Sequence, residues 1–211
     1  MNAKPSDGRH ARRVRTEARL CECVGELLRE GGPAAITVAA VAARADADKV
    51  LIYRYFEGLE GLMAAYAAGS DFWPTLDEIL GPDRALLAAP DHAHVAAQVL
   101  SNYAAALRRR PVTLDLLAWE CAHRNALTEA METVRERRST ELFAALAEAG
   151  FPLGGALPAV SALFAAAINY LAMRGRQIEV FAGLPAQTDD DWQRIVSAIE
   201  AAFRAMMASG R

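Results

Sequence analysis

The sequence has few cysteines and no apolar leader. Cys21, Cys23 and Cys121 are the only thiols among 211 residues, and an odd number of cysteines does not form the paired framework of a small secreted domain. The first residues are polar and charged, without the apolar segment of a secretory signal. We therefore expect a cytoplasmic protein with reduced thiols.

Clusters of metal ligands and catalytic groups are also lacking. Cys21 and Cys23 are two residues apart, so on a helix their side chains point about 200° apart and cannot reach one ion. The two histidines of segment 92–94 fail for the same reason, and we interpret Cys121 and His123 as a core thiol and a partly exposed imidazole. No nucleophile elbow, glycine-rich phosphate loop or carboxylate pair is found. We predict no metal, no cofactor and no enzymatic activity.

Aromatic residues, proline, glycine and long β-branched runs are scarce, which disfavours a β-sandwich or barrel. Aromatics make up 7% of the chain, and glycine and proline together number 23. Alanine, in contrast, accounts for 46 residues and has the highest helix propensity. The composition predicts an all-α protein.

Strong net charge and a clear membrane segment are absent as well. The net charge of −3 gives no global attraction to nucleic acid or anionic lipid. Residues 1–19 nevertheless carry six cations against two anions, whereas residues 63–211 carry 13 cations and 17 anions. Residues 149–173 have no formal charge, but a spanning helix needs about 20 predominantly apolar residues, and this stretch is interrupted by proline and glycine. We interpret it as containing a helix buried at an interface and predict no membrane association.

Apolar periodicity predicts about nine helices. Residues 1–11 form an expected flexible basic arm, and residues 12–30 a helix that ends at Gly31-Gly32-Pro33. A break is expected at Trp73-Pro74. The last helix has three aspartates at its start, where the helix dipole favours anions.

Two short helices follow the first one closely. Thr37 is a suitable N-cap for one of them and Asp48 for the next, and Asp46 lies between them, where a turn often needs positive φ. Val41 and Ile52 are expected to pack inward. This pattern predicts a helix-turn-helix, whose second helix enters the DNA major groove and needs a polar or small outer face.

Residues 37–56, and the segment 57–62 after them, resemble the DNA-binding unit of the tetracycline-repressor-like (TetR) transcription regulators. The strongest match is Lys49-x-x-Ile-Tyr-Arg-Tyr-Phe56, and the likeness covers roughly residues 12–72. The resemblance implies a three-helix DNA-binding domain over residues 12–72. It also implies an α-helical effector-binding and dimerisation domain over residues 73–211, where a bound small molecule releases DNA.

The resemblance also implies DNA-contacting roles for individual residues. Thr37 would bind a phosphate, Lys49 a phosphate or base edge, and Tyr53 and Tyr55 would set the register through their hydroxyl groups. The residues expected to meet DNA are Arg12 in the basic arm, Thr37, Lys49, Val50, Leu51, Tyr53, Arg54 and Tyr55.

The sequence departs from the family at four positions. Asp46 stands where the family usually has Gly, Asp48 where it has Ser, Leu51 where it has a small hydroxyl residue, and Leu59 where it has Lys. Leu51 can contact a thymine methyl but cannot bond a base edge. We expect modest DNA affinity with steep salt dependence.

The body of the chain offers a second group of candidate residues. A mostly apolar pocket with a few polar groups is the usual small-molecule site. The polar or aromatic residues within its aliphatic helices are Tyr103, Trp119, His123, Asn169, Tyr170, Met173 and Arg174. Trp119 and His123 share a helix face, and the expected ligand is apolar or aromatic with a few hydrogen-bonding groups.

The last two long helices have apolar stripes and small residues, so two from each subunit can form a four-helix bundle across a two-fold axis. We predict a homodimeric repressor that binds double-stranded operator DNA and responds to a small-molecule effector. The alternative is an all-α ligand-binding or scaffolding protein with a degenerate DNA-binding face.

Overall fold

The computed structural model describes residues 6–69 and 72–209. Within those residues it contains ten α-helices, two short 3-10 helices and one two-stranded hairpin. The chain divides into two compact units. One contains the residues up to Phe72 with Trp119–Val134, and the other contains Trp73–Ala118 with the residues from Arg135. The predicted all-α fold is confirmed.

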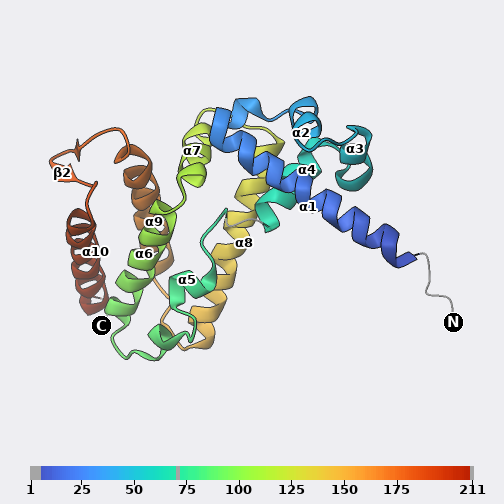
Figure 1. Cartoon of the computed structure of the whole chain (residues 1–211). Coiled ribbons are helices and arrows are strands. Elements are labelled where there is room, and N and C mark those ends of the chain that lie inside the picture. Colours follow the sequence, from blue (N-terminus) through green and yellow to red (C-terminus); the bar gives the residue numbers. More distant parts are fainter. Residues whose placement is uncertain (1–5, 70–71, 210–211) are drawn as a thin grey trace. The chain divides into compact units, whose positions relative to one another are not determined.

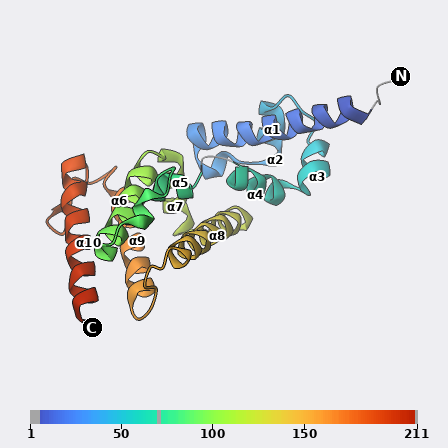
Figure 2. The same ribbon diagram turned by 90° about the horizontal axis from the view of Figure 1, so that it is seen from below.

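The amino-terminal unit begins with α1 (Ser6–Gly31), which contacts α2 (Val38–Arg44) and α4 (Leu59–Gly69), as Figure 2 shows. A 3-10 turn (Pro33–Ala35) follows α1, and α3 (Val50–Phe56) packs against α4. The core of this unit includes Leu20, Val24 and Ile52, all fully buried.

The predicted flexible arm is wrong over residues 6–11, because α1 already begins at Ser6. Arginine and alanine dominate residues 9–13, and both favour helix, so the helix extends beyond the stretch with an apolar stripe. Residues 1–5 of the predicted arm lie outside the described residues. The end of α1 at Gly31 agrees with the predicted glycine stop.

The carboxy-terminal unit is built around α6 (His92–Arg108), which packs against α5 (Leu76–Leu80), α9 (Leu157–Arg174) and α10 (Asp189–Ser209) (Figure 1). A 3-10 helix (Ala85–Ala88) joins α5 to α6. Helices α7 (Pro111–Glu120) and α8 (Ala126–Glu148) follow, and their segment Trp119–Val134 belongs to the amino-terminal unit. Asp91 caps α6 by accepting from the backbone N–H of His94 at 3.1 Å. Val99, Leu107 and Ile168 are buried in this unit.

One strand pair interrupts the helices. Strands β1 (Val180–Phe181) and β2 (Leu184–Pro185) form an antiparallel hairpin whose turn is Ala182-Gly183, both at positive φ. Helical periodicity gave no signal for so short an element.

The three cysteines are free and differ in exposure. Cys23 is fully buried in the core of the amino-terminal unit, Cys21 is half-buried and Cys121 is exposed. Burial raises the pKa of the Cys23 thiol. No group of three or more metal-ligating side chains occurs among the described residues.

Helix α9 is also the one helix in the described parts that is long and apolar enough to span a membrane. Its mean hydropathy is 1.3 over 18 residues, and 22% of that window is buried. Length and composition alone do not separate such a helix from one that packs against another protein surface.

Candidate nucleic-acid interface and ligand cavity

Helices α2 and α3 form the predicted helix-turn-helix. Thr37 caps α2, its hydroxyl oxygen accepting from the N–H of Ala40 at 3.1 Å, and the Asp48 carboxylate accepts from the N–H of Val50 at 2.9 Å. Asp46 has φ of 49° in the turn, a conformation that Asp tolerates better than most residues. The Thr37 cap and the positive φ of Asp46 are confirmed, whereas the N-cap of α3 is Lys49 and not Asp48 as predicted.

Helix α3 buries one face and exposes the other. Ile52 is fully buried and Phe56 half-buried, whereas Tyr53 is 56% exposed and Val50 is 49% exposed. Lys49 and Arg54 are exposed as well. The helix therefore presents a cationic and aromatic surface to solvent, with apolar Val50 at its start.

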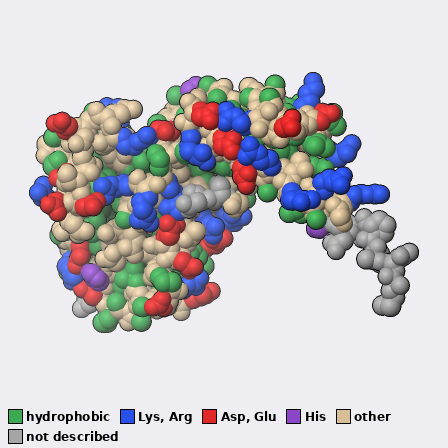
Figure 3. Space-filling view, in the orientation of Figure 1, with side chains coloured by type: hydrophobic (Ala, Val, Ile, Leu, Met, Phe, Trp, Pro, Cys, Tyr) green, Lys and Arg blue, Asp and Glu red, His purple; other side chains and the backbone are tan. Residues whose placement is uncertain are grey.

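The other residues predicted to contact DNA differ in their exposure to solvent. Arg12 is exposed on α1, and Thr37 is exposed at the start of α2. Leu51 is half-buried. Tyr55 is half-buried too, with the Arg13 guanidinium 5.1 Å from its ring centre. Lys and Arg side chains gather toward the amino-terminal end of α1 in Figure 3.

An ion-pair network that sequence reasoning missed joins α1 to α2. The Arg44 guanidinium binds both carboxylate oxygens of Glu30, at 2.8 and 2.5 Å, and reaches Glu26 at 3.4 Å. Hydrogen bonds from Arg44 lower the pKa of Glu30 and raise that of Arg44 itself. The bidentate geometry links the end of α2 to the end of α1. The 14-residue separation of Arg44 and Glu30 left no local signal.

The joint between α3 and α4 allows no side chain at one position. Glu57 ends α3 with φ of 63°, and Gly58 has φ of 124°. A Cβ on Gly61 would lie 1.7 Å from the carbonyl oxygen of Phe56. Gly61 therefore allows the start of α4 to touch the end of the recognition helix.

The carboxy-terminal unit contains a cavity of about 360 Å³, within the range of small-molecule sites. Its walls come from α6, the second half of α8, and α9. Tyr103 and Asn169 both line it, and the Tyr103 hydroxyl donates to Asn169 Oδ1 at 2.5 Å. Burial raises the pKa of Tyr103, so this hydroxyl stays protonated at neutral pH.

The other predicted ligand residues do not line this cavity. Trp119 and His123 stack on each other with ring centres 4.7 Å apart, and they belong to the amino-terminal unit. Tyr170 is exposed and packs edge-on against Phe181 of β1. Met173 and Arg174 are half-buried at the end of α9, where Arg174 donates to Gln177.

Several lining residues were assigned other roles from sequence. Trp73, predicted only as a helix break, is buried against Tyr103 with ring centres 5.8 Å apart. Leu142 and Phe143, which are neighbours on α8, also line the cavity. A helix stripe looks the same in sequence whether it faces a packed core or a cavity.

Comparisons with known proteins agree with this geometry. Residues 26–66 match the family model of the bacterial regulatory proteins of the tetR family. The fold is similar to the crystal structure of a TetR-like transcriptional regulator from Rhodococcus sp. RHA1, with a TM-score of 0.53 and 18% identity, covering 90% of this chain and 96% of that one. No curated protein matches the chain.

The matched segment contains the end of α1, both helices of the helix-turn-helix and most of α4. Within that segment, α3 exposes Lys49, Tyr53 and Arg54 to solvent. The segment 26–66 thus matches the helix-turn-helix domain of the tetR family, and the fold of the chain is similar to that of a TetR-like transcriptional regulator.

Proposed function

We propose that the protein is a cytoplasmic repressor that binds operator DNA as a homodimer and is released when a small, largely apolar molecule enters the cavity of the carboxy-terminal unit. The observation that carries the DNA-binding half is the exposure of Lys49, Tyr53 and Arg54 on α3, opposite the fully buried Ile52. The proposal involves no catalytic step.

The roles of individual residues follow from their chemistry. Lys49 pairs with a phosphate, and the Tyr53 and Thr37 hydroxyls donate to phosphate oxygens, which fixes register rather than sequence. Val50 and Leu51 make apolar contacts with thymine methyl groups in the major groove. Arg12, on α1, contacts the phosphate backbone of the DNA.

The dimer part of the proposal rests on the exposed faces of the last two long helices. Leu163 of α9 is 70% exposed and Tyr170 is 42% exposed. The same two helices expose small residues that do not line the cavity, namely Ala159, Ala167, Ala198, Ala201 and Ala202. Small residues allow two helix pairs to approach closely across a two-fold axis, and a two-fold dimer suits a palindromic operator.

The effector part rests on the cavity. It is mostly apolar, with Tyr103 and Asn169 as convergent polar groups, which is the usual composition of a small-molecule site.

The test is fluorescence anisotropy with labelled DNA from the region flanking the gene, at two salt concentrations. Tyr53→Phe removes only the hydroxyl, so we expect roughly fivefold weaker binding per half-site. Thr140→Val also removes a single hydroxyl, at an exposed position on α8 in the other unit, and serves as the control. Lys49→Ala is expected to weaken binding to all sequences and to lower the salt slope by about 1 per protomer.

Unchanged binding in both Tyr53→Phe and Lys49→Ala would contradict the interface. It would favour the alternative, an all-α ligand-binding or scaffolding protein. Leu51, Leu59 and the acids Asp46 and Asp48 motivate that alternative, because they weaken base readout and phosphate attraction.

A further inference from the structure

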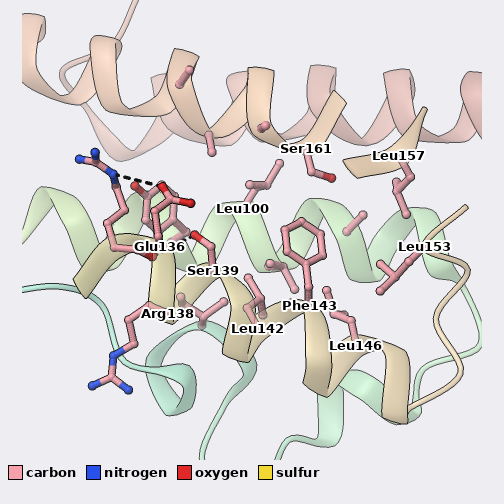
Figure 4. A pocket seen from close by; sticks show the side chains of 18 of the residues that line it. Leu100, Glu136, Arg138, Ser139, Leu142, Phe143, Leu146, Leu153, Leu157 and Ser161 are labelled. Atoms are coloured by element: carbon pink, nitrogen blue, oxygen red, sulfur yellow. Dashed lines mark hydrogen bonds and ion pairs between the residues drawn. The ribbon is translucent and has the colours of Figure 1, made fainter. Parts of the chain in front are cut away.

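The cavity has a polar end and an apolar end. Glu136 and Ser139 lie at one end of the view in Figure 4, and Leu146, Leu153 and Leu157 lie at the other, with Phe143 between the two groups. From Glu136 to Leu146, α8 rises by about 15 Å. The cavity therefore favours an elongated molecule over a compact one.

Asn169 contributes a hydrogen-bond donor to the cavity, whose lining also includes the Glu136 carboxylate, an acceptor. The Tyr103 hydroxyl gives its proton to Asn169 Oδ1, which occupies the amide acceptor. Among the described residues no acceptor bonds the Asn169 amide nitrogen, although the residue lines the cavity. A ligand oxygen with lone pairs is the complementary partner for these two N–H groups.

The charged groups that line this end have partners of opposite charge, and the buried Nε of Arg138 has no hydrogen-bond partner among the described residues. Arg138 Nη1 lies 2.9 Å from Glu141, and Arg135 Nε lies 3.9 Å from Glu136. A charged head group entering the cavity loses its hydration and displaces one of these pairs to gain a partner of its own. An uncharged head group avoids that cost.

We propose that the effector is a straight-chain amphiphile with an uncharged carbonyl head. The carbonyl oxygen accepts from the Asn169 amide, and the hydrocarbon chain extends along α8 toward Leu146, Leu153 and Leu157. This inference rests on the proposed function, because it takes the cavity as the effector site.

The first test is calorimetric titration of the full chain with methyl esters of straight-chain carboxylic acids of increasing length. Each added methylene is expected to tighten binding by about fourfold until the apolar end is full. The free carboxylate and the alkylamine of the same length form the other arms, and both are expected to bind at least tenfold more weakly. Equal binding of either charged form, or no dependence on chain length, would overturn the proposal.

Variants at the two ends of the cavity distinguish the contribution of the ligand's head group from that of its hydrocarbon chain. Asn169→Leu keeps the side-chain size and removes the donor, so every ester is expected to bind about tenfold more weakly with an unchanged increment per methylene. Leu153→Ala, in the loop before α9, is expected to shift the length limit to a longer chain and leave short esters unaffected. A merely structural role for Asn169 would change the increment as well as the affinity.

Release of operator DNA is measured separately by anisotropy. If the esters bind with the expected pattern and DNA stays bound, the ligand class stands and the effector role fails. If compounds of another class release DNA while no ester shows the chain-length dependence, the effector role stands and the proposed class is wrong.

Discussion

At the scale of single residues, Glu78 is the most heavily bonded carboxylate of the carboxy-terminal unit. Its Oε2 accepts from the Thr75 N–H at 3.0 Å and from Arg110, a residue only 6% exposed, at 2.7 Å. Burial raises the pKa of Glu78, but the hydrogen bonds from Thr75 and Arg110 outweigh it and hold the pKa at about 2.

Replacing Glu78 by Gln is expected to lower the free energy of unfolding by about 2 kcal/mol at neutral pH, because a charge-assisted bond to a buried guanidinium is lost. A carboxylate whose pKa is lowered by folding stabilises the native state above its ordinary pKa of 4.5. The difference between variant and wild type is therefore expected to shrink as the pH falls from about 4.5 toward 2.

Urea unfolding at neutral pH and at pH about 3 measures both effects. Glu60→Gln on α4, where the side chain is exposed, is the control and is expected to change stability by less than about 0.5 kcal/mol at either pH. An equal deficit for Glu78→Gln at both pH values would show that its charge is not the cause.

Polar side-chain interactions differ in how well they can be predicted from sequence. The cap at Thr37 was predictable because its hydroxyl bonds to a backbone N–H only three residues further along the chain. The Arg44–Glu30 pair depends on how α1 and α2 pack, and a charge pattern contains no information about that.

At the scale of elements, the helix-turn-helix depends on the close contact of α3 with α4. Gly61→Ala places a methyl group where the Phe56 carbonyl oxygen lies. Since the clash is with backbone, the helices must separate, and we expect a loss of about 3 kcal/mol in stability together with weaker operator binding.

Gly69→Ala, at the other end of the same helix, is the matched control. Nothing lies within 4 Å of a Cβ at Gly69, so alanine is expected to be neutral or to stabilise by about 0.5–1 kcal/mol. Thermal unfolding and DNA anisotropy on both variants check the pair, and a harmless Gly61→Ala would mean that the joint is looser than described.

The order of the helices was predictable from sequence, whereas the faces by which they pack against one another were not. Apolar stripes predicted α1, α6, α8, α9 and α10, because a surface helix needs one buried face. The stripes did not reveal that α6, α8 and α9 leave a cavity between them, nor that Trp119 and His123 stack away from it. The hairpin of residues 180–185 is too short for a periodic signal.

At the scale of the whole molecule, the proposed dimer makes the next prediction. Leu163→Arg places a charge on the most exposed large apolar residue of α9, and burial of an unpaired charge at an interface is costly. We expect the variant to sediment as a monomer at concentrations where the wild type is a dimer, and to bind operator DNA more weakly with its fold intact.

Val14→Arg adds the same charge at an exposed apolar residue of α1 and is expected to leave the sedimentation coefficient unchanged. A Leu163→Arg protein that remains dimeric would place the interface elsewhere, and the dimer proposal would then lose its support from α9.

The burial of Cys23 has a kinetic consequence. A fully buried thiol with a raised pKa reacts with an alkylating reagent only when its surroundings open, whereas the exposed Cys121 is accessible in the closed state. The labelling rate of Cys23 therefore measures how often the amino-terminal unit opens. A ligand that binds only the closed unit lowers this labelling rate by the same factor by which it stabilises that unit. The alkylation rate of Cys23 therefore reports DNA binding without a fluorophore attached to the protein.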